Sequence, residues 1–237
     1  MPPSTLPLAT PSNLQYLNTL KQLVIFDLDG TLLNTINDLG NAANYALEQQ
    51  GFPTHDLSAY PFFVGNGVSM LLERVLPEDA RSTRNVDRLR TKFMEYYGTH
   101  LTDTTKPYPG IPELLETLMK MGVKIAVASN KYQSAVDRLI KYMFPDIKWC
   151  AIEGQKDDVP TKPDPSIVFS ILGKNPTPKA DVLYVGDSGV DMDTARRAAV
   201  ECVGVTWGFR PEKELRQHYA DHIISKPVEL LSLLNQE

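Results

Sequence analysis

The sequence predicts an α/β protein with a doubly wound parallel sheet, and two observations support this fold class. First, four short apolar runs have the character of buried strands, with helical patterns between them: residues 22–29, 123–130, 181–188 and 202–208. Second, these runs are continuously apolar rather than alternating, which is typical of strands covered by helices on both faces. Buried strands that alternate with helices indicate a parallel, Rossmann-like sheet.

The helical patterns between these strands follow from apolar spacing and from residues that start or end helices. Segment 111–122 is amphipathic, and Gly122 is suited to end it. Segment 190–200 forms the expected helix after the third strand. Asp164 and Pro165 suit N-cap and first-turn positions, so a further helix should begin there.

The chain between the first strand and residue 101 has a different character. It contains no convincing buried strand, and apolar residues recur at helical spacing in three segments: 36–52, 67–76 and 85–101. We therefore expect a helical insertion into an α/β core. The predicted units are a loose N-terminal tail (1–20), a core domain (21–34 and 106–237) and a helical cap domain (35–105).

Composition narrows the classes of function. The 237 residues are 42% hydrophobic and 22% charged, which is ordinary for a globular protein. With 24 basic and 29 acidic residues the net charge is −5, which argues against the basic face of a nucleic-acid-binding protein. No apolar run approaches the length of a membrane span, and residues 1–20 lack the basic start of a signal peptide.

The two cysteines indicate in which cellular compartment the protein is expected. Cys150 and Cys202 have no CxxC spacing and no histidine nearby. We therefore expect two reduced thiols and a cytoplasmic location. The expected partner is a small molecule rather than a nucleic acid or a membrane, and the expected assembly is a monomer or homodimer.

Polar side chains stand at the carboxyl ends of the predicted strands. Because parallel sheets bind ligands at that edge, we expect these residues to meet there. They follow the first, second and third strands or precede the helix that begins near Pro165: Asp27, Asp29, Ser129, Asn130, Lys162, Asp187 and Asp191.

The carboxylates of this set predict a magnesium site. Like charges at the mouth of a buried strand repel each other and are costly to desolvate, so Asp27 and Asp29 need a compensating cation. Asp27, Asp187 and Asp191 supply the hard oxygen ligands that Mg²⁺ prefers. Mg²⁺ is therefore the expected cofactor.

The donors of this set predict phosphate binding. Ser129, Asn130 and Lys162 are placed to hold phosphate oxygens. Gly30 lets the backbone turn sharply and bring N–H groups close to an anion. A carboxylate nucleophile that forms an aspartyl phosphate needs such surroundings. Asp29 can then protonate a leaving alcohol and later activate water.

Four motifs in this order resemble those of the haloacid-dehalogenase superfamily: "DLDGT" (27–31), "VASN" (127–130), "TKPDP" (161–165) and "VGDSGVD" (185–191). The resemblance is closest to the phosphoglycolate phosphatase-like branch, in which a helical cap follows the first motif. "FVGNGVSMLLERVL" (63–76) is similar to that branch's cap loop, and "GVTWGFRPEKEL" (204–215) to its C-terminal stretch.

The resemblance implies a role for each matching residue. Asp27 would be the nucleophile, and Asp29 would be the acid and base, with its carbonyl on Mg²⁺. Asp187 would bind the metal, and Asp191 would bind it directly or through its neighbours. The phosphate ligands and the cap loop that meets the substrate would be Ser129, Asn130 and Lys162, and Gly65, Asn66 and Gly67.

The sequence departs from the family pattern at two positions. Asn34 stands where the family usually has Asp, in the connection to the cap, and Asn can still cap a helix. Val200 stands where a Gly usually ends the helix after the fourth motif. A β-branched residue is poorly suited to a positive φ, so the local helix end is in question.

Single features separate the alternatives. A dehalogenase lacks the second carboxylate at Asp29, and a phosphonatase needs a cap lysine that segment 36–50 does not contain. A β-phosphoglucomutase-type mutase shares every core residue, and a non-catalytic binding protein could use the same fold. The resemblance favours a phosphatase with phosphoglycolate as the default substrate. Pyrophosphate, sugar phosphates and nucleotides stay open as substrates.

Overall fold

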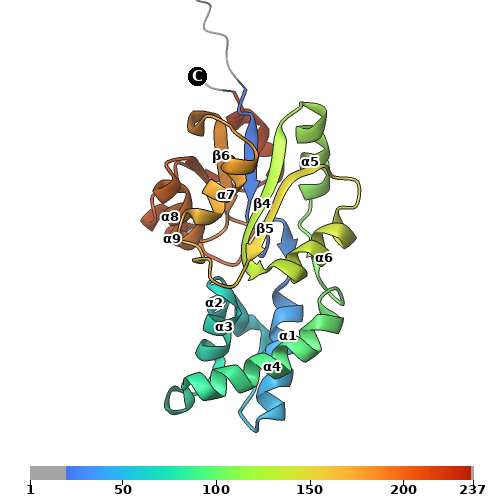
Figure 1. The fold of residues 1–237 in the computed structure, drawn as a ribbon, viewed down its shortest axis with the longest axis vertical. Coiled ribbons are helices and arrows are strands. Elements are labelled where there is room, and N and C mark those ends of the chain that lie inside the picture. The colour runs from blue at the N-terminus through green and yellow to red at the C-terminus, as the bar shows by residue number, and fades with distance from the viewer. Residues whose placement is uncertain (1–19, 236–237) are drawn as a thin grey trace, which may run out of the picture.

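A six-stranded parallel sheet forms the core of the protein. The structure is a computed structural model, and it describes residues 20–235. The strand order is β5-β4-β1-β6-β7-β8, and every neighbouring pair is parallel. The strands are β1 Leu23–Phe26, β4 Lys124–Tyr132, β5 Trp149–Gln155, β6 Val182–Gly186, β7 Glu201–Val205 and β8 His222–Ile224. The predicted doubly wound parallel sheet is confirmed (Figure 1).

The four predicted strands are the four interior strands of this sheet, and the two that the sequence missed are its edges. β5 mixes buried and half-buried residues and carries the acidic Glu153. β8 has three residues. Neither edge strand therefore forms the continuous apolar run that marks a strand buried on both faces.

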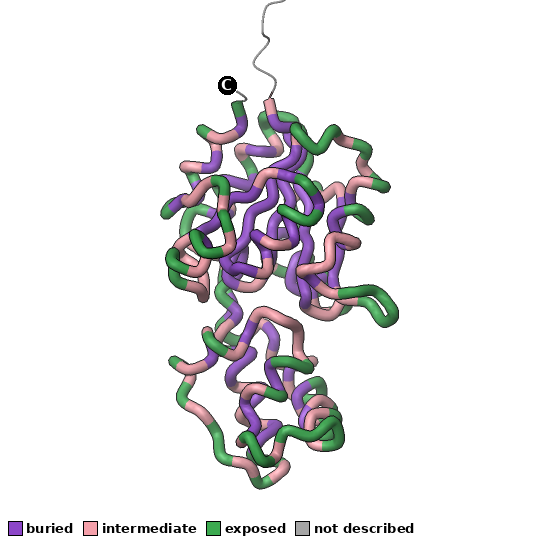
Figure 2. The backbone as a smooth tube through the Cα atoms, turned by 90° about the vertical axis from the view of Figure 1, so that its left-hand side faces the viewer, coloured by how far each residue is buried: buried purple, intermediate pink, exposed green. Residues whose placement is uncertain are grey.

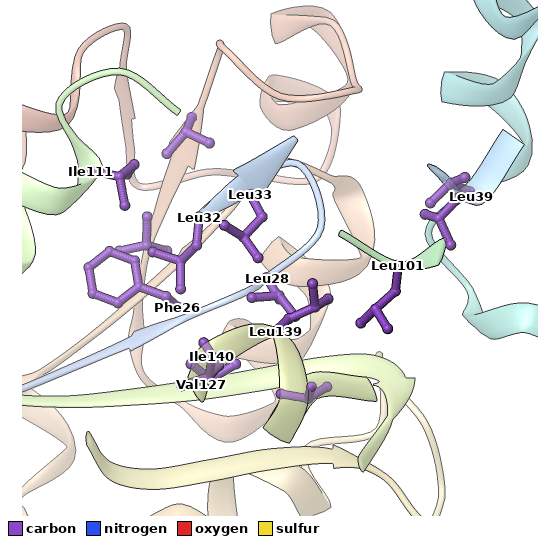
Figure 3. Packing of buried hydrophobic residues seen from close by; sticks show 14 of the residues in the cluster. Phe26, Leu28, Leu32, Leu33, Leu39, Leu101, Ile111, Val127, Leu139 and Ile140 are labelled. Atoms are coloured by element: carbon purple, nitrogen blue, oxygen red, sulfur yellow. The ribbon is translucent and has the colours of Figure 1, made fainter. Parts of the chain in front are cut away.

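Helices cover both faces of the sheet. Side chains alternate along β1, so Val24 and Phe26 join one apolar cluster and Leu23 and Ile25 join the other. Figure 3 shows part of the first cluster, with Ile140 of α6 near β4. α5 and α6 pack on this face, and α7, α8 and α9 pack on the opposite face. Their bounds are α5 Ile111–Lys120, α6 Gln133–Met143, α7 Ser166–Lys174, α8 Gly189–Ala198 and α9 Glu212–Gln217.

An inserted helical cap lies at one end of the molecule, beyond the sheet (Figure 1). It contains α1 Ile36–Gln49, α2 Tyr60–Phe63, α3 Gly67–Val75 and α4 Thr83–His100. The chain enters through β2 Leu33–Asn34 and returns through β3 Lys106–Pro107, which pair as antiparallel strands. Figure 2 shows buried residues both along the sheet and inside the cap. The domain boundaries at residues 35 and 105 stay a prediction.

A buried aspartate ties the two cap connections together. Asp38, in the first turn of α1, is 1% exposed. Its carboxylate accepts hydrogen bonds from the backbone N–H groups and hydroxyls of Thr104 and Thr105, at 2.6–3.1 Å. These bonds fix the entry and exit of the cap side by side, because each buried carboxylate oxygen needs such donors.

Two helix ends differ from the sequence prediction. The left-handed residue after α8 is Ala199, with φ 56°, and Val200 follows it. The positive φ expected at Val200 therefore occurs one residue earlier. The smaller Ala199 takes this unfavourable backbone conformation. At α7 the N-cap position is occupied by Pro165, while Asp164 accepts a hydrogen bond from the Ser166 N–H at 2.9 Å.

Among residues 20–235, no helix is both long and apolar enough to cross a membrane. The predicted N-terminal tail, apart from Leu20, lies outside the described residues.

Candidate active site

Three carboxylates converge at the carboxyl ends of β1 and β6. Asp27 follows β1, Asp187 follows β6, and Asp191 reaches in from the first turn of α8. One oxygen from each carboxylate lies within 4.8 Å of the others, and all three residues are buried. β1 and β6 are hydrogen-bonded neighbours in register, and this pairing brings Asp27 and Asp187 to the same edge.

The cluster carries more negative charge than its own cation neutralises. Burial and the Asp191 carboxylate raise the pKa of Asp27 to about 7, although the Lys162 ammonium opposes them. Burial, Asp191 and Asp27 likewise raise the pKa of Asp187 well above its usual range. A group of buried carboxylates with this excess charge fits a hard divalent cation such as Mg²⁺, which binds oxygen ligands.

Lys162 is the cation inside this cluster. Its buried ammonium donates to Asp27 Oδ1 at 2.8 Å, to Asp191 Oδ1 at 2.7 Å and to the Ala128 carbonyl at 3.0 Å. An ammonium has three donors, so each N–H is used. Burial opposes its charge, but the carboxylates of Asp191 and Asp27 raise the pKa of Lys162 well above its usual value. Lys162 is therefore a fixed positive charge beside Asp27.

Asn130 holds the loop that carries Lys162. Its Oδ1 accepts from the Lys162 backbone N–H at 2.8 Å, and its Nδ2 donates to the Lys162 carbonyl at 3.1 Å. Asn130 is predicted from the sequence to contact phosphate, whereas in the structure its amide oxygen and nitrogen both bond to the backbone of Lys162. Ser129 Oγ accepts from the Lys131 N–H at 3.2 Å, which leaves its hydroxyl hydrogen available to a ligand.

Asp29 lines the same cavity as Asp27 and Asp187 and is bound to a lysine that was not predicted from the sequence. Asp29 Oδ1 accepts from the Thr35 hydroxyl at 2.6 Å and lies 2.9 Å from Lys131 Nζ. Asp29 Oδ2 accepts from Lys131 Nζ at 3.0 Å. The available signal for Lys131 was its position, directly after Ser129 and Asn130 at the carboxyl end of β4.

Position 30 requires a glycine, because the Asp187 carboxylate lies directly against its backbone. Its φ is 91°, and a Cβ at this position would lie 2.2 Å from Asp187 Oδ2. Any larger residue would therefore displace a carboxylate of the cluster, in addition to straining the backbone.

A cavity lies between the core and the cap. It is lined by most of the predicted residues: Asp27, Asp29, Ser129, Asn130, Lys162, Asp187, Gly65 and Gly67. Asp191 and Gly30 are not among the residues that line the cavity. Asn66 is also outside this lining, and its Oδ1 accepts from Arg74 Nη2 at 2.7 Å. Gly65 and Gly67 have positive φ, 125° and 82°, so a side chain at either position would strain the backbone.

Arg210 joins the core to the cap loop and was also missed. It lies between β7 and α9, and its guanidinium donates to the Pro61 carbonyl at 2.6 Å and to the Val64 carbonyl at 2.7 Å. Asn130 Nδ2 adds a longer contact to the Gly65 carbonyl at 3.4 Å. The cap loop is therefore held over the acid cluster by charged hydrogen bonds from the core.

The chain is similar in sequence and in structure to several known proteins. Residues 24–205 match the family model described as haloacid dehalogenase-like hydrolase. A phosphoglycolate phosphatase of Mesorhizobium japonicum is 30% identical over 207 residues, covering 86% of this chain and 91% of that protein. A phosphoglycolate phosphatase of Haemophilus influenzae is 30% identical over 224 residues, covering 92% and 100%. A crystal structure from Lactobacillus delbrueckii subsp. bulgaricus superposes with a TM-score of 0.87 at 32% identity, covering 92% of this chain and 100% of that one.

Proposed function

The chain belongs to the haloacid dehalogenase-like hydrolase family, and on that premise we propose that it is a Mg²⁺-dependent phosphatase of small phosphate monoesters, with phosphoglycolate as the default substrate. The observation that carries this proposal is the cluster of Asp27, Asp187 and Asp191 beside Lys162, with Asp29 lining the same cavity as Asp27 and Asp187. The cluster suits a cation and a phosphate, and Asp29 suits proton transfer.

The proposed reaction has two steps on Asp27. The Asp27 carboxylate attacks phosphorus, the bond to the alcohol oxygen breaks, and an aspartyl phosphate forms. Asp29 gives a proton to the leaving oxygen and then takes one from the water that cleaves the phosphate from Asp27. Ser129 would donate to a phosphate oxygen, and Lys162 would keep its positive charge beside Asp27, where it stabilises the approaching phosphate. Asp27, Asp187 and Asp191 would hold Mg²⁺, which neutralises charge between the carboxylates and the phosphate when it is bound.

The test of this proposal is a panel of phosphate esters assayed with Mg²⁺ for release of inorganic phosphate. We expect release from phosphoglycolate and from an aryl phosphate, each ranked by kcat/KM. A mutase of the β-phosphoglucomutase type would instead need a phosphorylated sugar and a bisphosphate primer. Absence of phosphate release from every ester would reject the phosphatase proposal.

Asp29→Asn should separate the two steps. Without an acid, release of an alkyl alcohol should slow by about 100-fold or more, whereas an aryl phosphate, which leaves easily, should lose less in the first step. Loss of the base should slow cleavage of the phosphoenzyme for both esters. Rapid-mixing measurements of alcohol release check this, and equal losses for the alkyl and aryl esters would argue that Asp29 is not the acid.

Arg210→Met should weaken closure of the cap. Loss of the charged hydrogen bonds to Pro61 and Val64 should raise KM for a small ester by about tenfold. Arg216→Met is the matched control, because Arg216 lies nearby on α9 and is exposed, paired with Glu212 on its own helix. Steady-state kinetics of both variants decide the matter: an equal change in KM for the two would show that Arg210 has no special part in closure.

A further inference from the structure

Lys131 is a buried cation, and its one carboxylate partner within residues 20–235 is Asp29, which also has a proposed role in proton transfer. Its side chain is 6% exposed, and Asp29 is the carboxylate that contacts it within the described residues. Burial opposes its charge, but the Asp29 carboxylate raises the pKa of Lys131 above its usual range. Lys131 is therefore a charged ammonium out of water, in the wall of the cavity.

The other two cations of the cavity wall are already engaged. Lys162 donates to Asp27, Asp191 and the Ala128 carbonyl. Arg210 donates to carbonyls of the cap loop. Among the residues that the structure describes around the cavity, Lys131 is the cation positioned to meet the part of a ligand that lies away from the acid cluster.

A tyrosine from the cap lies next to Lys131 in the wall of the cavity. Tyr97 on α4 also lines the cavity, and the Lys131 ammonium lies 5.1 Å from the centre of its ring. Tyr97 is 4% exposed, and within the range 20–235 its hydroxyl has the Lys131 ammonium as a neighbour but no acceptor at hydrogen-bonding geometry. Burial raises the pKa of Tyr97, so its phenol is a neutral donor. An ammonium can only donate, so the Tyr97 O–H is a buried donor without an acceptor, which favours a ligand that supplies one.

The contacts of Asp29 explain when Lys131 needs a new partner. Both oxygens of Asp29 are held by Lys131 in this structure. A substrate whose ester oxygen meets Asp29 competes with Lys131 for the same carboxylate. Any weakening of that ion pair leaves the buried Lys131 charge less well paired, which is unfavourable unless the substrate supplies a new partner.

We propose that Lys131 and Tyr97 are specificity-determining residues that bind a carboxylate on the leaving-group side of the phosphate ester. This inference rests on the proposed phosphatase function and deepens it by assigning residues to the substrate class. A carboxylate is the expected group because Lys131 already holds one, that of Asp29, through both oxygens. Lys131 belongs to the core and Tyr97 to the cap, so the substrate carboxylate joins the two bodies as it binds.

The experiment compares two esters that differ at the position of the carboxylate. Phosphoglycolate carries the carboxylate, and 2-hydroxyethyl phosphate carries a neutral hydroxymethyl group of similar size in its place. The wild-type enzyme should prefer phosphoglycolate in kcat/KM. Lys131→Met should lower the ratio of the two kcat/KM values on the order of 100-fold, as expected when one partner of a buried charge pair is removed. Tyr97→Phe, which removes only the hydroxyl, should lower it by about threefold to tenfold.

Controls separate recognition from folding and from the phosphatase function itself. Lys131→Arg keeps the charge and should retain most of the preference, and thermal melts report whether each variant is folded. Glycolate should inhibit the wild-type enzyme, and Lys131→Met should weaken glycolate more than it weakens inorganic phosphate. An unchanged ratio in Lys131→Met and Tyr97→Phe, or a wild-type preference for the neutral ester, overturns this inference while the phosphatase function stands. Release of phosphate from neither ester overturns both.

Discussion

Asp27→Asn should abolish turnover, with a loss of roughly four to six orders of magnitude in kcat. The amide has nearly the shape of the carboxylate, but it is a poor nucleophile and a weaker metal ligand. The loss should not come from unfolding. Asp27 is buried beside the Asp191 carboxylate, and these surroundings raise its pKa to about 7, so removing its charge relieves repulsion in the metal-free protein. The melting temperature of the metal-free variant should therefore match or exceed that of the wild type.

Initial rates with an aryl phosphate measure the effect of Asp27→Asn. Asp146→Asn is the matched control, because Asp146 is exposed in the connection between α6 and β5, before the amino end of β5. The control should keep normal kinetics. Turnover by Asp27→Asn within tenfold of the wild type would refute the role of Asp27 as the nucleophile.

Removal of divalent metal should silence the enzyme, and added Mg²⁺ should restore it. One carboxylate oxygen from each of Asp27, Asp187 and Asp191 lies within 4.8 Å of the others, and without a cation these carboxylates repel a phosphate dianion. Ca²⁺ should support activity poorly, because its higher and looser coordination spoils an in-line displacement. Activity before and after treatment with EDTA is the first measurement.

Titration calorimetry with Mg²⁺ supplies a readout that does not depend on turnover. Asp187→Asn should weaken Mg²⁺ binding by about tenfold or more, since it removes one charged ligand from the cluster. Asp193→Asn, on the following helix α8, is the control, because the Asp193 carboxylate pairs with Arg196 and His218 instead of the cluster. Full activity in a metal-free preparation, or equal Mg²⁺ affinity in both variants, would contradict the assignment of the metal site.

The sequence was sufficient for the parts of the fold that depend on local pattern. The interior strands are continuous apolar runs, and their carboxyl ends carry the residues that form the acid cluster, so Asp27 and Asp187 could be placed before the structure was known. The edge strands β5 and β8 were not predicted, because half-exposed strands lack a continuous apolar run. The starts and ends of the predicted helices were correct to within three residues, as at Ser166, Ala199 and the end of α1 at Gln49.

The parts of the site that could not be predicted from the sequence are contacts between segments far apart in the chain. Lys131 is part of the site through its hydrogen bond to Asp29, which lies 102 positions earlier in the chain. Arg210 is part of it through its hydrogen bond to the carbonyl of Pro61, which lies 149 positions earlier. Asn130 was assigned to phosphate from its neighbours in the sequence, yet its amide is bound to the backbone of Lys162. Side chains with several possible partners cannot be paired from spacing alone, because the fold decides which partner is near.

The most direct test of the central claim is to trap phosphate on Asp27. The Asp29→Asn enzyme is mixed rapidly with an aryl phosphate and Mg²⁺, because slow cleavage of the phosphoenzyme should let it accumulate. The reaction is quenched with acid and reduced with borohydride, which converts a phosphorylated aspartate to homoserine. We expect a burst of released alcohol matched by an equal amount of protein-bound phosphate, and homoserine at position 27. A burst without protein-bound phosphate, or homoserine at another carboxylate, would contradict the mechanism.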